Sequence, residues 1–108
     1  MNLKDIENKH IHFIGVGGIG MSGLAELLSQ RGCHVSGSDL SSNGNTERLE
    51  KKGLHVVLGH TSSIIEGKDI IVVSTDIKKD NPELVEARRR ALPILHRAGM
   101  LALLMDEY

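Results

Sequence analysis

A glycine-rich run near the start of the chain has the spacing of a phosphate-binding loop. Residues 15–20 read GVGGIG and contain G-x-G-x-x-G. Where such a run leaves a strand and opens a helix, the free N–H groups and the positive dipole end of that helix favour an anion. We expect Gly15 to permit the sharp turn and Gly20 to let the helix pack close to the strand. Gly17 and Gly18 carry no side chain, so a ligand can approach their backbone. The motif predicts a bound phosphate without identifying the molecule that carries it.

An acidic residue follows at the position where dinucleotide-binding folds bind the ribose of their ligand. Asp39 lies nineteen residues beyond Gly20, at the end of the second predicted strand. In dinucleotide-binding folds a carboxylate at this place binds the ribose diol. A nucleoside diphosphate sugar also carries a ribose diol, so Asp39 fits either class of ligand. A loop cap after the strand is its structural alternative.

Alternating strands and helices are expected to position these residues. The apolar runs predict strands at residues 11–14, 34–38, 54–58, 70–74 and 93–95. Helical spacing predicts helices at residues 18–31, 46–52, 80–90 and 97–107, with a loop and one helical turn over 59–67. Gly32 and Gly53 are placed for left-handed C-caps, and Pro82 for a first helical turn. The order predicts an α/β, Rossmann-like fold, in which a parallel five-stranded sheet has helices on both faces, in a single domain.

Composition narrows the class of protein. The 108 residues include 13 Lys and Arg against 14 Asp and Glu, a formal charge of -1, and only 2% aromatic residues. A nucleic-acid-binding domain normally has a basic excess and stacking platforms, so no nucleic-acid partner is expected. No apolar run reaches the roughly 20 residues of a membrane span, so no membrane partner is expected either. The first ten residues are too polar for a secretory signal, which favours the cytoplasm.

Several residues that suggest chemistry have simpler explanations. The six histidines lack the close spacing of metal ligands, so no metal is expected. We expect the histidines of the predicted strands, His12, His34 and His55, at the edge of the core or on the surface. Cys33 is expected to be a small buried hydrophobic residue rather than a redox centre. The three successive arginines at residues 88–90 point in different directions on a helix, which favours a solvated face.

The sequence around these motifs is more specific than the fold, because it resembles one family. The segment IHFIGVGGIGMSGLAELL at residues 11–28 is similar to the opening of the UDP-N-acetylmuramate–alanine ligases of the Mur ligase family. The resemblance continues to the end of the chain, through VSGSDL (35–40), T-x-x-L-x-x-x-G (46–53), Gly59-His60, IIVVSTDIKKDNPEL (70–84) and PILHRAGMLALLM (93–105). The chain departs from the family at Asp76, where a small residue is usual, and at Gly99 and Leu103, where glutamates are frequent.

The resemblance implies a substrate and a set of contacts. Residues 1–108 would be the N-terminal domain that binds UDP-N-acetylmuramate. The glycine loop would hold the diphosphate, Asp39 the ribose, and His60 and Ser74 with Thr75 would lie beside the uridine. The expected substrate-binding residues are Gly15, Gly17, Gly18, Ile19, Gly20, Met21, Ser22, Asp39, His60, Ser74 and Thr75.

The resemblance also implies where the chemistry occurs. In the family, ATP and Mg²⁺ activate the lactyl carboxylate of the sugar to an acyl phosphate, which the amine of L-alanine attacks. That step needs a P-loop, and no G-x-x-x-x-G-K-[ST] occurs in this sequence. We therefore expect the ATP-binding and C-terminal domains to be absent from this chain, which should bind substrate with no catalytic residue and no cofactor of its own.

Two other functions fit the glycine loop. One is an NAD-binding Rossmann domain of a dehydrogenase or a regulatory sensor. The other is a domain that keeps the fold but has lost its ligand, and the extra negative charge of Asp76 is the feature that favours it.

Overall fold

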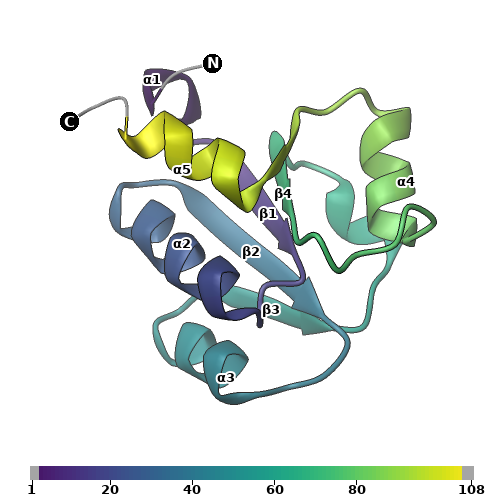
Figure 1. Cartoon of the computed structure of the whole chain (residues 1–108), viewed down its shortest axis with the longest axis horizontal. Helices are drawn as coiled ribbons and strands as arrows, with labels where there is room; N and C mark the ends of the chain where they lie inside the picture. Colours follow the sequence, from purple (N-terminus) through teal and green to yellow (C-terminus); the bar gives the residue numbers. More distant parts are fainter. Residues whose placement is uncertain (1–2, 106–108) are drawn as a thin grey trace.

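Five strands form one parallel sheet in the order β3-β2-β1-β4-β5 (Figure 1). A computed structural model describes residues 3–105. The strands are β1 (His10–Ile14), β2 (His34–Asp39), β3 (His55–Leu58), β4 (Ile70–Val73) and β5 (Ile94–His96). The expected parallel five-stranded sheet is confirmed, with each strand within two residues of its predicted position. The carboxyl ends of all strands meet at one edge, because the strands are parallel.

The helices follow the predicted order, with one addition. They are α1 (Leu3–Ile6), α2 (Ile19–Gln30), α3 (Gly44–Lys51), the 3₁₀ turn η1 (Ser62–Ile65), α4 (Pro82–Arg89) and α5 (Arg97–Met105). The short α1 was not expected from the sequence. The predicted end of the last helix, at residues 106–107, lies outside the described residues.

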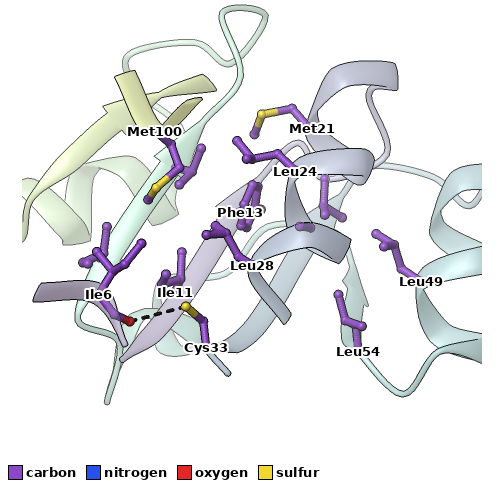
Figure 2. Packing of buried hydrophobic residues seen from close by; sticks show 14 of the residues in the cluster. Ile6, Ile11, Phe13, Met21, Leu24, Leu28, Cys33, Leu49, Leu54 and Met100 are labelled. Carbon is purple, nitrogen blue, oxygen red and sulfur yellow. Dashed lines mark hydrogen bonds between the residues drawn. The ribbon is translucent and has the colours of Figure 1, made fainter. Parts of the chain in front are cut away.

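Alternation along the strands divides the interior into two layers. Ile11 and Phe13 of β1 face the larger cluster, which α2 and α5 cover together with Ile6 of α1. Figure 1 shows α2 and α5 side by side across the strands, and Figure 2 shows Phe13 facing Leu24 and Leu28 of α2.

The second layer is smaller and lies on the opposite face of the sheet. Ile14 of β1 and Ile71 of β4 pack there against Ile65 of η1 and Leu84 of α4. Helices therefore cover both faces, as predicted. No helix in residues 3–105 is long and apolar enough to cross a membrane.

Local signals at the helix ends are confirmed. Gly32 and Gly53 follow α2 and α3 with φ of +91° and +88°, the left-handed region that favours glycine. Asn81 caps α4 by accepting from the backbone N–H of Glu83 at 2.9 Å, and Pro82 is the first residue of that helix.

One expected position is wrong. His12 was predicted at the edge of the core or on the surface, but it is fully buried on the second face of β1. It is tolerated there because Ser36 and Glu83 satisfy both ring nitrogens. His34 and His55 are exposed, as expected. Cys33 is buried, as expected, and its thiol donates to the carbonyl of Ile6 at 3.3 Å (Figure 2).

Residues 88–90 lie at the exposed end of α4, as predicted. Arg89 and Arg90 both pair with Glu86, which holds the pKa of that carboxyl at about 2. These arginines therefore form a local charge cluster on the helix surface.

Candidate anion-binding site

The glycine loop joins β1 to α2 and is fixed to the end of β2. Gly15 has φ of +87°, which confirms the sharp turn expected there. The backbone N–H groups of Gly15 and Val16 both donate to the carbonyl of Ser38, at 2.9 and 3.0 Å. Gly37 makes this contact possible, because a Cβ at residue 37 would lie 2.5 Å from the Cβ of Val16. Backbone hydrogen bonds thus attach the loop to the carboxyl edge of the sheet.

Three backbone N–H groups at the start of α2 have no acceptor. Gly17 donates to the Oδ2 of Asp39 at 2.8 Å, and Gly18 donates to the carbonyl of Gly15 at 3.3 Å. Gly18 caps the twelve-residue helix without a side-chain hydrogen bond. Within the described part of the chain, the N–H groups of residues 19–21 donate to no protein atom. The helix therefore offers an anion three free donors and its positive dipole end.

Asp39 connects the glycine loop to the end of β2. Its Oδ2 accepts from Gly17, and its Oδ1 accepts from the backbone N–H of Leu40 at 2.8 Å. Because a carboxylate has about four acceptor positions, it can still accept hydroxyl groups from a ligand. Asn43 and Asn45 brace the loop further by donating to the carbonyl of Gly17, at 3.2 and 2.9 Å.

A cleft of about 310 Å³ opens beside these groups, at the carboxyl edge of the sheet. Six of the predicted substrate-binding residues line it: Gly15, Gly17, Gly18, Asp39, His60 and Ser74. Asp76 also lines the cleft and is exposed, so the departure from the family adds a negative charge at the site.

The other predicted substrate-binding residues lie around the cleft rather than in its wall. Ile19 and Gly20 are exposed in the first turn of α2. Met21 and Ser22 are only 4% and 1% exposed. Met21 keeps a free backbone N–H, whereas the backbone N–H of Ser22 donates to the carbonyl of Gly18 at 3.0 Å and offers a ligand nothing. Thr75 lines an adjoining cavity of about 420 Å³ with Lys79, Arg88 and His96, which shares Ser74 and Ile77 with the cleft.

The expected reason for Gly20 is wrong. A Cβ at this residue would meet the side chain of Arg97, whose Cδ lies 2.6 Å and Nε 2.8 Å away. The nearest neighbours of a side chain at residue 20 are therefore atoms of Arg97, the first residue of α5, and not atoms of the strand. The guanidinium of Arg97 thus lies next to the first turn of α2.

A buried carboxylate, Glu83, forms hydrogen bonds with residues at and next to the cleft. Glu83 of α4 is fully buried, and its Oε1 accepts from the Nε2 of His12 at 2.7 Å and from the Oγ of Ser38 at 2.6 Å. Its Oε2 accepts from the backbone N–H of Thr61 at 3.0 Å and from the Nδ1 of His60 at 3.3 Å. Burial raises the pKa of the Glu83 carboxyl, but the hydrogen bonds from His12 and Ser38 outweigh it and leave that pKa below its usual value.

Sequence reasoning missed this network, although a signal for it exists. His12, Ser36 and Ser38 are polar residues in strands, and their register places them on one face of adjacent β1 and β2. Polar side chains on a buried face require a polar partner from the covering helix. Glu83, at the start of the predicted helix over residues 80–90, was the residue able to supply it.

Size alone does not identify the site. A cavity of about 350 Å³ lies at the amino edge of the sheet, lined by residues that include His10, Cys33, His34 and His55. None of the free amides of α2 faces it. Within residues 3–105, no group of three His, Cys, Asp or Glu side chains is placed to hold a metal ion. The carboxyl-edge cleft is the candidate because open α/β sheets bind ligands there.

Comparisons with known proteins agree on one family. The model of the Mur ligase family, catalytic domain, matches residues 10–108. The UDP-N-acetylmuramate–L-alanine ligase of Magnetococcus marinus is 56% identical over 97 residues, which cover 90% of this chain and 20% of that protein. The chain thus spans about a fifth of the length of the curated relatives it matches.

Solved structures show the same relationship. The UDP-N-acetylmuramate–alanine ligase of Thermotoga maritima superposes with a TM-score of 0.88 at 31% identity, over 92% of this chain and 23% of that one. The UDP-N-acetylmuramate:L-alanyl-γ-D-glutamyl-meso-diaminopimelate ligase of Neisseria meningitides reaches 0.76 at 29% identity, over 82% of this chain and 28% of that one.

Proposed function

Since the chain belongs to the Mur ligase family, we propose that it binds UDP-N-acetylmuramate as the nucleotide-sugar domain of the ATP-dependent ligase that joins L-alanine to this sugar. The observation that carries the proposal is the row of three free N–H groups at residues 19–21, next to a cleft that contains Asp39 and His60. A diphosphate is the anion that a glycine loop of this geometry accepts.

Each part of the ligand has a complementary group. The free amides at residues 19–21 and the positive end of α2 bind the diphosphate. Asp39 accepts the ribose hydroxyls through its unused lone pairs. His60 and Ser74, which line the cleft, lie beside the uracil, and Thr75 extends this wall into the adjoining cavity.

The residues of this chain do not fit a centre for the ATP-dependent step. The sequence holds no P-loop, and residues 3–105 hold no group of side chains for a metal ion. We therefore assign binding of ATP, Mg²⁺ and L-alanine to other domains of a longer enzyme, and binding of the UDP-sugar to this one. We place the reaction in the cytoplasm, as the family resemblance implies.

Amide chemical shifts test the proposal at the atoms that carry it. Addition of UDP should shift the backbone N–H resonances of residues 19–21 more than those at the amino edge of the sheet. Asp39→Asn should weaken UDP binding by about ten-fold, the effect of losing one charge-assisted hydrogen bond. Asp80→Asn, at an exposed position that does not line the cleft, is the matched control and should not change affinity. Shifts confined to the cavity at the amino edge would contradict the proposal.

A further inference from the structure

The buried carboxylate of Glu83 determines where the protons of its neighbours lie. An ionised carboxylate only accepts hydrogen bonds, and the lowered pKa of Glu83 keeps it ionised at neutral pH. Each of its oxygens receives two partners, so its four acceptor positions are filled. Every partner must therefore present a hydrogen to it. For the two histidines this requirement selects the ring nitrogen that is protonated.

Ser38 adds a second constraint on the same nitrogen of His60. The hydroxyl of Ser38 donates its single hydrogen to the Oε1 of Glu83. Its oxygen lies 3.0 Å from the Nδ1 of His60, and with its hydrogen already used it can only accept there. Both neighbours of this Nδ1, the Ser38 oxygen and the Glu83 Oε2, are therefore acceptors. Neutral His60 must carry its proton on Nδ1, which leaves Nε2 with a free lone pair.

The nitrogen of His60 that keeps its lone pair is accessible. His60 lines the cleft, and its side chain is 8% exposed. Among residues 3–105, no protein group bonds to the His60 Nε2, and no buried side-chain nitrogen or oxygen is left without a partner. The Nε2 atom is therefore accessible, and the cleft is where its lone pair is available.

We propose that Glu83 and Ser38 hold His60 as an obligatory hydrogen-bond acceptor in the cleft, and that its Nε2 selects a ligand by taking the imide N–H of uracil. The assignment of the uracil rests on the proposed function. The ribose hydroxyls already have an acceptor in Asp39, and the imide is the one N–H donor of a uridine base. A base with an acceptor at the position of the imide N–H would place its lone pair against that of the His60 Nε2, which is unfavourable. Glu83 is thus a positioning residue that acts through His60.

Nitrogen NMR of the histidine rings tests the protonation state without any ligand. Long-range proton–nitrogen spectra at neutral pH should show His60 of the wild-type chain with the proton on Nδ1 and a bare Nε2. In Glu83→Gln the amide can also donate, so the constraint is lost and a resonance for protonated Nε2 should appear. Ser38→Ala keeps the carboxylate and should show a smaller change. A wild-type His60 with its proton on Nε2 would overturn the inference, and circular dichroism verifies that each variant is folded.

Ligand discrimination tests the consequence. The wild-type chain should bind UDP about ten-fold more tightly than UDP methylated at N3, because the methyl group removes the donor and leaves Nε2 unpaired. The ratio of the affinities for UDP and N3-methylated UDP should fall toward one in Glu83→Gln. It should stay unchanged in His55→Gln, which replaces an exposed histidine at the amino edge of the sheet. Equal wild-type affinities for the two would refute selection through the imide. If only 2′-deoxy-UDP binds more weakly, the imide assignment is also refuted, in favour of a hydroxyl donor. Absence of UDP binding would contradict the proposed function, whereas the NMR result decides the state of His60 by itself.

Discussion

Glu83 couples the stability of the protein to pH. The pKa of its carboxyl is lower in the folded chain than the ordinary value of 4.5. Its ionised form therefore contributes fully to the free energy of unfolding above pH 4.5, and that contribution is lost as the pH falls through the lower folded pKa.

We predict that Glu83→Gln unfolds more easily than the wild type at pH 7, by about 1–3 kcal/mol, because buried donors lose a charged acceptor. The difference should shrink as the pH is lowered from 5 toward 3. Urea unfolding at several pH values measures this. The exposed Glu50→Gln is the matched control, and a difference that does not change below pH 4.5 would contradict the linkage.

Two glycines at the site differ in what a methyl group would meet. At Gly37 the added Cβ would lie 2.5 Å from the Cβ of Val16, which the loop backbone holds in place. At Gly20 it would meet the outer atoms of Arg97, an exposed and flexible side chain. We predict that Gly37→Ala destabilises by about 1–3 kcal/mol and Gly20→Ala by less than about 0.5 kcal/mol. Thermal unfolding of both variants compares them, and equal losses would show that Arg97 is not free to move.

At the scale of elements, α3 contributes to the site through its N-cap, Asn43, which lines the cleft. Its N-cap residue Asn43 accepts from the backbone N–H of Thr46 at 2.9 Å and also donates to the carbonyl of Gly17. The same side chain therefore starts the helix and braces the glycine loop. Asn45, within α3, also donates to the carbonyl of Gly17, at 2.9 Å, but it does not cap the helix.

We predict that Asn43→Ala costs about 0.5–2 kcal/mol, the usual effect of losing an N-cap. Asn45→Ala should cost less, because α3 keeps its cap. The free energy of unfolding in urea measures both. A larger loss for Asn45→Ala than for Asn43→Ala would show that the bracing of Gly17, and not the cap, is the important contact.

The sequence was sufficient for the elements because their signals are local. The order of strands and helices follows from hydrophobic periodicity, and Gly32 and Pro82 occupy the helix ends that their backbone preferences favour. The burial of His12 and the contact between Gly20 and Arg97 could not be predicted in this way. Both depend on a partner more than seventy positions further along the chain, Glu83 for His12 and Arg97 for Gly20. Only the packed structure brings these partners together.

For the molecule as a whole, the parallel sheet explains how a site assembles from distant segments. The glycine loop, His60 and Ser74 follow the carboxyl ends of three strands, and Asp39 is the last residue of a fourth. The Cα radius of gyration is 12.6 Å, close to the roughly 13 Å expected for a single domain of this length. The site is therefore a property of the whole sheet, and the phosphate motif alone does not specify it.

The central claim, a uridine diphosphate site, is tested most directly by calorimetric titration of this chain with UDP-N-acetylmuramate, UDP and NAD in parallel. The free amides of α2 would accept the diphosphate of any of the three, so the base and sugar must decide between them. We predict heat of binding for both uridine ligands and none for NAD. Binding of NAD without binding of either uridine ligand would contradict the account and identify the domain as a dinucleotide-binding one.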